Sequence, residues 1–386
     1  MLQHFKTDVL IVGGGPAGAS TALSLLTYSD LKVTIVEYSA FDAVRVGEQV
    51  SPSLFELLEY LKIQKSDFED DSLVKGYANI AAWGSDRLST RNSIFSTQEE
   101  SYQLDRESFD LLLLQQAAQR GADIFPNTKC THFRQTENKE WEIDLLHQSK
   151  GAFSITAKFL VDATGRQSNI CRKLGIPSTR HDELVAIGAF LQFENTSTLQ
   201  QDILLETVPE GWWYCATLPN EKMTLTLFTD ADIAKAQQLN KKENWNRLLA
   251  NTLFVKNKVH GSISYGNPWV KNAFSQYTNT TLSSNFIAVG DAAASFDPIS
   301  SMGIGFAVSS ACHAAKAVID YSNGHQNAIN QYQQNIEKIF TNYLNIRSQF
   351  YDKERRWPLE LFWQRRMMHT PVLNRLVAVG DHPTRN

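Results

Sequence analysis

The sequence predicts an α/β protein in which a dinucleotide-binding domain is interleaved with an antiparallel β-sheet domain and followed by C-terminal helices. Three observations carry this prediction. A glycine-rich turn joins an apolar run to a helix near the N-terminus, and a second glycine-rich turn lies close to residue 300. Residues 184–269 change to short strand patterns, and from Ala314 onward the pattern is helical.

The composition is that of a globular protein with room for a second unit. Of the 386 residues, 42% are hydrophobic and 20% are charged, which is ordinary for a protein with a packed core. The length suits one large α/β domain that carries a second domain. A net charge of −4 gives no global reason to expect nucleic acid as a partner.

The cysteines and the apolar runs bear on the compartment. Cys130, Cys171, Cys215 and Cys312 show no metal or redox spacing, so we expect four reduced, buried thiols and no metal site. The N-terminus lacks a basic-then-apolar leader, and no run approaches the ~18 apolar residues of a membrane span. We therefore expect a cytoplasmic protein without a membrane partner.

The first glycine-rich turn is typical of a Rossmann-type dinucleotide site. An apolar strand from Asp8 ends in Gly13-x-Gly15-x-x-Gly18, and a helix follows. The first glycine permits the tight turn, the second lets the backbone approach a pyrophosphate, and the third lets the helix pack on the strand. Glu37 ends the next apolar run, at the place where a carboxylate accepts ribose hydroxyls. The expected cofactor contacts of this unit are Gly13, Gly15, Pro16, Ala17, Gly18 and Glu37.

A motif in the next loop brings a family resemblance into view. Arg45-x-Gly47-Glu48 is followed by Pro52 and an amphipathic helix. Together with the glycine-rich turn, this segment resembles the flavin-dependent monooxygenases and halogenases of the p-hydroxybenzoate hydroxylase superfamily, which implies FAD as the cofactor. Arg45 offers a fork of donors for ribose or phosphate oxygens, and Glu48 is expected to hydrogen-bond near the flavin ring. A surface ion pair of Arg45 with a neighbouring acid is the alternative.

A long helix begins near Asp105 and runs to about Arg120, where Gly121 stops it. Its start resembles the superfamily's Leu-Asp-Arg-x-x-Phe-Asp signature, and the resemblance implies that Arg106 reaches the flavin. The alternative is that Asp105 caps the helix and Arg106 is exposed.

Two later elements complete the resemblance. An apolar strand breaks at Asp162-Ala-Thr-Gly165, and a second strand ends at Gly290-Asp291 before an Asp-Pro turn and a glycine-rich helix start. Parallel strands present such loops at one sheet edge. The resemblance implies that Asp291 accepts from the ribityl chain, and a helix N-terminus favours the anionic reduced flavin. The residues expected at the FAD from these elements are Asp162, Ala163, Gly165, Gly290, Asp291, Pro298, Gly303 and Ile304.

The β-rich stretch of residues 184–269 is expected to form an antiparallel sheet that walls the substrate space, with one helix at about Ala231 to Leu249. A strand over residues 74–83 is expected at the edge of this space. Trp83, Trp212 and Trp213 are predicted to line the substrate pocket. For Trp212 and Trp213, a place in the hydrophobic core is the alternative interpretation.

Two features bear on halogenation. Halogenases of the group that act on phenols and pyrroles carry a lysine upstream of a comparable Trp-Gly, and Lys75 is the candidate here, with a spacing one residue off. A solvated lysine is the alternative. Halogenases acting on tryptophan carry a Trp-x-Trp-x-Ile-Pro motif, of which Trp213 and Pro219 remain, and this departure argues against halogenation.

The domain boundaries follow from these elements. We expect the FAD-binding domain to comprise residues 1–70, 101–183 and 280–325, and the substrate domain residues 71–100 and 184–279. Residues 326–386 form the expected C-terminal helical segment. Its arginine and aromatic residues are interpreted as a helical lid or, alternatively, as a docking surface for a partner.

Within the group, the segments Ala82–Asp86, Asp297–Ile304 and Arg356–Arg366 resemble the LodB/GoxB-type flavoproteins that mature cysteine tryptophylquinone. This implies an FAD-dependent monooxygenase that hydroxylates a tryptophan side chain of a partner protein, an amino-acid oxidase precursor. With one dinucleotide turn in the sequence, electrons are expected from transiently docked NAD(P)H or from a reductase. A hydroxylase or halogenase of an aromatic small molecule and a flavin-binding chaperone are the alternatives.

The expected chemistry needs few ionisable side chains, because the cofactor carries the hard step. Glu48 and Asp297 are the nearest candidates for a general base. Pro298 belongs to the same turn as Asp297 and is included as a catalytic candidate.

Overall fold

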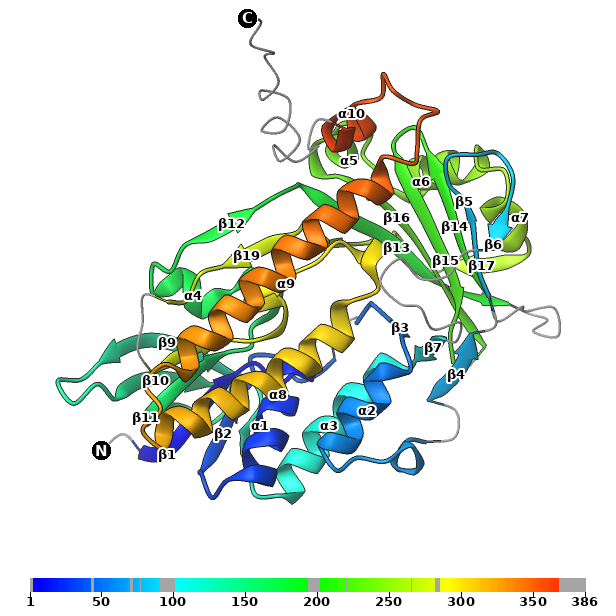
Figure 1. Cartoon of the computed structure of the whole chain (residues 1–386). Helices are drawn as coiled ribbons and strands as arrows, with labels where there is room; N and C mark the ends of the chain where they lie inside the picture. The colour runs from blue at the N-terminus through cyan, green and yellow to red at the C-terminus, as the bar shows by residue number, and fades with distance from the viewer. Residues whose placement is uncertain are drawn as a thin grey trace, which may run out of the picture.

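Two large β-sheets form the frame of the molecule, and the chain passes between them repeatedly (Figure 1). The computed structural model describes residues 3–367, apart from positions 43–44, 70–71, 77, 91–100, 194–201, 220, 265 and 282–284.

The first sheet is the dinucleotide-binding sheet, with the strand order β8-β2-β1-β11-β10-β9 and β20 paired with β11. Its strands β1, β2, β8, β11 and β20 run parallel, whereas β9 and β10 form antiparallel pairs. The strands are β1 (Gln3–Val12), β2 (Val33–Val36), β8 (Asp123–Phe125), β9 (Thr128–Gln135), β10 (Trp141–His147), β11 (Gly151–Asp162) and β20 (Phe286–Ala288). Apolar side chains fill the central strands because helices cover them: in β2, every residue from Val33 to Val36 is buried.

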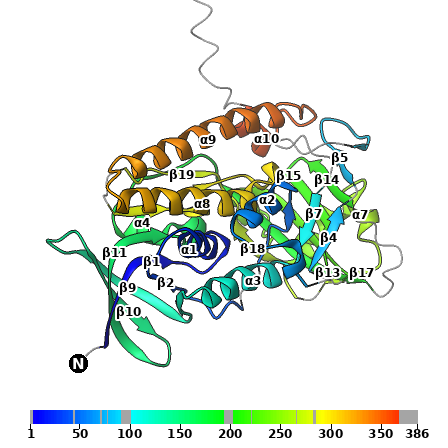
Figure 2. The ribbon, with the colours of Figure 1, turned by 60° about the horizontal axis from the view of Figure 1, so that its bottom comes forward.

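Helices pack on this sheet in layers. Helix α1 (Pro16–Tyr28) packs against α3 (Arg106–Gln119) and α8 (Gly303–Ser322), and α9 (Ala328–Tyr351) lies on α8 (Figure 2). The shorter α2 (Ser53–Tyr60) also contacts α8. Alanines and other small residues on α1 and α8 allow this close packing, and Ala19, Ala22, Ala314 and Ala315 are fully buried.

The second sheet has the order β17-β13-β16-β15-β14-β5-β6, with β18 paired with β13. All of its pairs are antiparallel except β14 with β5, which is parallel. Its strands are β5 (Ala78–Ala82), β6 (Ser89–Thr90), β13 (Leu184–Phe193), β14 (Asp202–Val208), β15 (Gly211–Thr217), β16 (Lys222–Asp230), β17 (Ser262–Ser264) and β18 (Trp269–Asn272). Helices α5 (Ala231–Ala236), α6 (Lys242–Ala250) and α7 (Val255–Lys258) follow its strands, and α6 and α7 bury apolar residues against one face.

Two predicted elements are divided in the structure. The helix expected over Ala231 to Leu249 is split into α5 and α6, because Gln238 takes a left-handed φ of 51° and Leu239 turns into the core. The strand expected over residues 74–83 is split into β4 (Leu73–Gly76) and β5. Strand β4 joins a small sheet with β3 (Gln49–Val50) and β7 (Ser101–Leu104), whereas β5 joins the second large sheet.

The C-terminal part consists of α9 and α10 (Leu361–Met367), which contact each other at one end of the second sheet (Figure 1). A further small sheet, β12 (Ser178–Arg180), β19 (Gln276–Thr278) and β21 (Ala294–Ser295), connects the two large sheets along the chain. No helix in the described ranges is long and apolar enough to cross a membrane. The exact domain boundaries stay predictions.

The four cysteines are buried and unpaired with one another. Burial raises the pKa of the Cys130, Cys215 and Cys312 thiols to about 12. At neutral pH these side chains therefore stay protonated and serve as small apolar groups of the core.

Candidate active site

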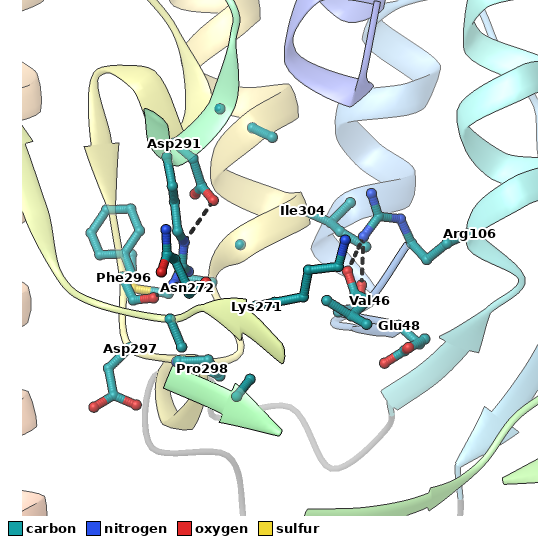
Figure 3. A pocket seen from close by; sticks show the side chains of 18 of the residues that line it. Val46, Glu48, Arg106, Lys271, Asn272, Asp291, Phe296, Asp297, Pro298 and Ile304 are labelled. Carbon is teal, nitrogen blue, oxygen red and sulfur yellow. Dashed lines mark hydrogen bonds and ion pairs between the residues drawn. The ribbon is translucent and has the colours of Figure 1, made fainter. Parts of the chain in front are cut away.

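A cavity of about 500 Å³ is lined by residues from both large sheets and their connecting loops (Figure 3). We call one part of its wall the loop end and the other the sheet end. The loop end comprises Gly15, Pro16, Ala17, Arg106, Ala163, Gly165, Asp291, Gly303 and Ile304. The sheet end comprises Ala186, Trp212, Tyr214, Thr224, Thr226, Phe228, Trp269 and Lys271. Residues 46–49, Asp297 and Pro298 also line the cavity.

The turn between β1 and α1 is packed tightly against the loop that follows β11. Gly13 has a φ of +114°, and a Cβ atom there would lie 2.2 Å from the carbonyl oxygen of Ala163. A Cβ on Gly18 would lie 1.9 Å from the carbonyl oxygen of Gly13. At Gly15, in contrast, the Cβ position meets no protein atom within 4 Å. The turn is therefore closed toward the protein and open at the N-terminus of α1, where an anion binds favourably.

Glu37 stands at the end of β2 beside this turn. Its Oε2 accepts a hydrogen bond of 2.8 Å from the backbone N–H of Gly14, and its Oε1 accepts one of 2.8 Å from the backbone N–H of Ser39. The carboxylate is thus fixed next to the glycine-rich turn, in the position expected for a group that accepts ribose hydroxyls.

Arg106 lines the cavity from the first turn of α3. Its guanidinium donates to the carbonyl oxygens of Val46 and Gly47, the latter at 3.2 Å, and to Asp110 Oδ1 at 3.1 Å (Figure 3). Asp105 caps the same helix by accepting from the backbone N–H groups of residues 107 and 108. Asp105 therefore caps the helix and Arg106 lines the cavity in the same structure. The sequence analysis had treated these two roles as alternatives.

Asp291 and the start of α8 form the opposite wall of the loop end. The Asp291 carboxylate accepts a hydrogen bond of 3.0 Å from Arg166 Nε, which keeps it at the cavity surface (Figure 3). The Cβ positions of Gly303 and Gly305 meet no protein atom within 4 Å. The N-terminus of α8 thus presents open backbone to the cavity, as the N-terminus of α1 does.

Glu48 lies between the two ends and is 5% exposed. Burial raises the pKa of its carboxyl group to about 7, against the opposing effect of the Arg106 charge. Its Oε1 makes no hydrogen bond to any residue in the described part of the chain. A carboxyl group with such a pKa exchanges a proton near neutral pH, which is a requirement for a general acid or base.

The sheet end is built by alternation along β15. Trp212 and Tyr214 face the cavity, whereas Trp213 and Cys215 face the opposite side of the sheet, where Trp213 packs on Trp245 with ring centroids 5.1 Å apart. Phe228 stacks on Trp212 at 4.1 Å. The result is a flat, aromatic wall on one side of the cavity.

Comparison with known proteins decides the family. The family described as FAD binding domain matches residues 6–345. The chain belongs to this FAD-binding family. LodB of Marinomonas mediterranea, described as an FAD-dependent oxidoreductase, is 42% identical over 360 residues, which cover 93% of this chain and 96% of LodB. The tryptophan 2-halogenase of Chondromyces crocatus is 25% identical, over 90% of this chain and 68% of the halogenase.

Solved structures share the fold. The flavin-dependent halogenase CmlS matches with a TM-score of 0.82 at 24% identity, over 96% of this chain and 69% of CmlS. QhpG, described as a peptidyl tryptophan dihydroxylase essential for tryptophylquinone cofactor biogenesis, matches with a TM-score of 0.72 at 23% identity, over 94% of this chain and 78% of QhpG. The predicted α/β fold class, the FAD cofactor and membership of an FAD-dependent monooxygenase family are confirmed.

The loop end fits FAD. Its two open helix N-termini suit the diphosphate and the flavin ring, and the fixed carboxylate of Asp291 suits hydroxyl groups of the ribityl chain. Glu37 does not line the cavity but stands beside the glycine-rich turn, where a carboxylate suits ribose hydroxyls. Pro16, Ala17, Ala163, Gly165, Pro298 and Ile304 line the same cavity, and their contact with FAD stays a prediction. Gly290 contributes by close packing: a Cβ there would lie 2.7 Å from the Cβ of Ala17.

Three predicted site residues are held by interactions within the protein. Arg45 forms an ion pair of 2.6 Å with the buried Asp110 and does not line the cavity, so its contact with the cofactor stays a prediction. Asp162 is fully buried, and its carboxylate accepts from the backbone N–H groups of residues 164, 170 and 171. It therefore holds the Ala163-Thr164 loop in place and does not reach the cavity.

Asp297 is the third. Its carboxylate is fully buried and accepts from Ile299 N–H at 3.0 Å, Arg347 Nε at 3.0 Å and Tyr351 Oη at 2.8 Å. Asp297 nevertheless lines the cavity, and three hydrogen bonds within the protein hold its carboxylate. Its role as a general base stays a prediction, and Glu48, with its raised pKa, is the stronger candidate.

Two of the three predicted pocket tryptophans also lie elsewhere. Trp213 is on the far face of the sheet, in the hydrophobic core, because side chains alternate along β15. Trp212 lines the cavity, and its contact with a substrate stays a prediction. Trp83 is 3% exposed and packs behind Trp212, at 6.2 Å between ring centroids, among the aromatic residues of α9 and α10. Lys75 lies on β4 and does not line the cavity.

Sequence reasoning missed Tyr214, Trp269 and Lys271. The last two come from β18, whose alternation directs both side chains inward, and Figure 3 shows Lys271 extending into the cavity. The Lys271 backbone belongs to the β13–β18 ladder, and no side-chain hydrogen bond or ion pair of Lys271 is found among the described residues. Gly188 leaves space for the Trp269 ring, since a Cβ at Gly188 would lie 2.5 Å from it. In the sequence, the only sign that Trp269 and Lys271 share a face was their spacing of two residues within Trp-Val-Lys-Asn.

Three arginines in the described part of the C-terminal segment, residues 356, 365 and 366, are paired within the protein. Arg366 forms an ion pair of 2.8 Å with Asp230, and Arg365 contacts Asp230 at 2.9 Å and Asp232 at 2.6 Å. Arg356 pairs with Glu354 at 2.7 Å. These charges hold the C-terminal helices on the second sheet, which agrees with the lid interpretation better than with a basic docking surface.

Proposed function

We propose that this protein is an FAD-dependent monooxygenase that hydroxylates a tryptophan side chain of a partner amino-acid oxidase precursor during tryptophylquinone biogenesis. One observation carries the proposal: the loop end that fits FAD and the aromatic wall of the sheet end belong to a single cavity. The cofactor and a flat aromatic side chain can therefore meet without an intervening wall. The identity of 42% to LodB and the fold shared with the tryptophan dihydroxylase QhpG support this choice of substrate.

The protein's own residues position the reactants. FAD, when bound and reduced, supplies the chemistry that activates oxygen. The N-termini of α1 and α8 bind its negatively charged parts, and Trp212 and Phe228 provide a stacking surface for the substrate ring. Glu48 lies between them and takes up the proton that the substrate carbon loses when the hydroxylated ring regains aromaticity. Burial of the cavity wall keeps bulk water away from this step.

Reducing equivalents are proposed to come from NAD(P)H that docks transiently or from a separate reductase. A glycine-rich turn of the Gly13–Gly18 type occurs once in the sequence, and the structure uses it for the FAD site. Steady-state consumption of NADH, NADPH or a reduced ferredoxin in the presence of the FAD-loaded protein distinguishes these donors.

The deciding experiment compares the masses of tryptophan-containing peptides of the partner oxidase from cells with and without this gene. We expect one tryptophan to gain oxygen only when the gene is present. The variant Glu48→Leu is expected to abolish the gain although the protein retains FAD, which is read from its flavin absorbance. An unmodified partner in cells with wild-type protein would exclude this function.

A second candidate is a hydroxylase or halogenase of a free aromatic compound. The observation that favours it is the similarity to a tryptophan 2-halogenase over 90% of the chain. It predicts that a free indole or phenol is turned over by the purified protein with a reductase, and halogenation further predicts consumption of bromide.

A further inference from the structure

One hydroxyl group at the end of α9 joins two parts of the cavity wall that come from different segments of the chain. Tyr351 Oη accepts a hydrogen bond of 3.0 Å from Trp212 Nε1 and donates one of 2.8 Å to Asp297 Oδ2. Trp212 belongs to the sheet end, and Asp297 belongs to the turn that brings Pro298 to the cavity. Tyr351 itself is 2% exposed and does not line the cavity, so it can act on a ligand only through these neighbours.

Chemistry fixes the direction of the two hydrogen bonds. The indole N–H of Trp212 can only donate, and the carboxylate of Asp297, which is paired with Arg347, can only accept. A tyrosine hydroxyl group has one proton and also accepts, so it serves both neighbours at once. Burial, together with the Asp297 charge, raises the pKa of the Tyr351 hydroxyl group well above 10. The proton therefore stays in place near neutral pH.

Trp212 transmits this contact to the surface of the cavity. Its ring is 1% exposed and stacks on Phe228, with the ring centroids 4.1 Å apart and the ring planes at 21°. Phe228 is 7% exposed and lines the same cavity. A buried indole N–H without an acceptor is unfavourable. Loss of the Tyr351 hydroxyl group would therefore let the Trp212 ring turn toward another partner and move the Phe228 ring that stacks on it.

The turn at Asp297 does not depend on Tyr351 alone. Its carboxylate also accepts from Arg347 Nε at 3.0 Å and from Ile299 N–H at 3.0 Å. Its backbone N–H donates to Tyr343 Oη at 2.7 Å. The turn keeps these hydrogen bonds when the Tyr351 hydroxyl group is removed, whereas Trp212 Nε1 loses its acceptor. The consequence falls on the sheet end.

The ring of Tyr351 is held without its hydroxyl group. It packs on Trp83 and Trp363, with ring centroids 5.6 and 6.0 Å apart. The guanidinium groups of Arg347 and Arg366 lie 5.2 and 5.1 Å from its ring centroid. Phenylalanine keeps these contacts. Replacement of Tyr351 by phenylalanine therefore removes the two hydrogen bonds and little else.

We infer that Tyr351 is a positioning residue, which holds the aromatic wall of the sheet end in a fixed place relative to the Asp297-Pro298 turn. A substrate ring that lies against this wall is thereby placed relative to the loop end and its cofactor. The inference rests on the proposed function, because it concerns where the aromatic ring of that reaction lies. It also gives α9 a role at the site, since its last residue reaches the substrate wall.

The first test measures the affinity of indole for the FAD-loaded protein, followed by the change in flavin absorbance. Tyr351→Phe is expected to weaken indole binding roughly three- to tenfold, which corresponds to the loss of one hydrogen bond. Its flavin content should equal that of the wild type, because the turn stays held. An unchanged indole affinity in Tyr351→Phe, or no binding of indole by the wild type, would overturn the inference.

Tyr343→Phe is the matched control. Tyr343 is also a buried tyrosine of α9, and its hydroxyl group contacts Ser275 Oγ and the backbone N–H of Asp297. Both variants lose buried hydrogen bonds, so both should melt at a lower temperature than the wild type. Only Tyr351→Phe should lose affinity for indole. Equal losses of affinity in the two variants would reflect a general loss of stability and would overturn the inference.

A double-mutant cycle assigns the effect to the contact between the two side chains. Trp212→Phe removes the donor of the 3.0 Å hydrogen bond, and Tyr351→Phe removes its acceptor. If this hydrogen bond positions the wall, the double variant should bind indole about as tightly as the weaker-binding single variant, because the bond is lost only once. Losses that multiply in the double variant would mean that the two side chains act independently, and the inference would fail.

A second test uses the fate of oxygen. The chemically reduced, FAD-loaded protein is mixed with oxygen and the partner precursor, and oxidised tryptophan and hydrogen peroxide are both measured. An oxygen molecule that is not used on the ring takes up two electrons from the reduced flavin and two protons, and leaves as hydrogen peroxide. Tyr351→Phe should raise the share of hydrogen peroxide, because the ring is misplaced, whereas Tyr343→Phe should match the wild type.

The outcomes of this second test separate the inference from the proposed function. Oxidation of tryptophan by the wild type, with a larger share of hydrogen peroxide in Tyr351→Phe, supports both. Oxidation of tryptophan with equal shares of hydrogen peroxide in the wild type and Tyr351→Phe supports the function and overturns the inference. If the wild type oxidises no tryptophan, the proposed function fails, and the indole affinities still decide whether Tyr351 positions the wall.

Discussion

At the loop end of the cavity the backbone forms the wall, whereas at the sheet end side chains form it. The loop end depends on glycines that have no side chain. A Cβ atom would collide with the backbone at Gly13 and Gly18 and would protrude into the cavity at Gly15. At the sheet end, large rings such as Trp212 and Phe228 fill the space. Changes at the loop end should therefore act on cofactor retention, and changes at the sheet end on the choice of ligand.

Asp297 and Pro298 also line the cavity, and Arg347 and Tyr351 of α9 hold the Asp297 carboxylate. If the two ends act separately, substitutions in the turn, in the sheet and at this contact should have different effects.

The largest effect is expected for Arg347→Met. This change leaves the buried carboxylates of Asp297 and Asp182 without the cation that contacts both at 3.0 Å. Loss of one partner of a buried ion pair costs about 3–5 kcal/mol of the free energy of unfolding. Chemical denaturation followed by circular dichroism measures the change. The triple variant Arg347→Met, Asp182→Asn, Asp297→Asn should regain part of the loss, and an equally unstable triple variant would show that packing of the arginine, not its charge, is what matters.

Gly18→Ala should have the second largest effect. The free energy of unfolding should fall by about 3 kcal/mol, because the new Cβ would lie 1.9 Å from the carbonyl oxygen of Gly13. The purified variant should contain little flavin, measured as the ratio of absorbance at 450 and 280 nm. Thr27→Ala, at the other end of α1, is the control and should retain FAD. Full flavin content in Gly18→Ala would mean that the turn can relax, and the backbone would not be the element that sets the loop end.

Glu48 should make the stability of the FAD-free protein depend on pH. The pKa of its carboxyl group is about 7 in the folded protein and near the ordinary 4.5 in the unfolded chain, so the folded state binds more protons between these values. Its contribution is therefore fully present below pH 4.5 and is lost as the pH rises to about 7, by up to roughly 3 kcal/mol. Denaturation series at pH 5 and pH 8 measure this slope. The slope should be reduced in Glu48→Gln, and an unchanged slope would argue against a perturbed carboxyl group here.

The smallest changes in stability and ligand affinity are expected for substitutions on the two faces of β15. Trp213→Phe removes contacts with Trp245 and should cost about 1–3 kcal/mol without altering ligand affinity. Trp212→Phe changes the cavity wall and removes the 3.0 Å hydrogen bond from Trp212 Nε1 to Tyr351 Oη, so it should weaken indole binding. Melting temperatures, and titration of the FAD-loaded protein with indole followed by flavin absorbance, separate these outcomes. Similar ligand affinities of the two variants would contradict the assignment of the faces.

The loop end could be predicted from the sequence because its geometry is local. The tight turn at Gly13, the helix start at Gly303 and the capping of α3 by Asp105 each depend on residues within a few positions of one another. The fold class followed from the same turns together with the change of pattern after residue 184.

The sheet end could not be predicted in the same way. It depends on which face of each strand a side chain lies on, and on contacts between residues far apart in the sequence. Periodicity shows that β15 alternates, but not which of Trp212 and Trp213 faces the cavity. The sequence also does not reveal that Arg347, fifty residues later, donates a hydrogen bond to the Asp297 carboxylate. Lys271 entered the site through the pairing of β18 with β13, a contact between strands more than 80 residues apart.

The FAD site draws its wall from residues as far apart as Gly15 and Ile304, so it exists only when most of the chain is folded. A molecule that binds the folded but not the unfolded chain shifts the equilibrium by mass action, in proportion to its concentration relative to its dissociation constant. The flavin supply of the cell should therefore set the lifetime of this protein against proteases. Riboflavin starvation would deplete the enzyme itself as well as its activity, and restored riboflavin would bring back activity only as fast as new chains are made.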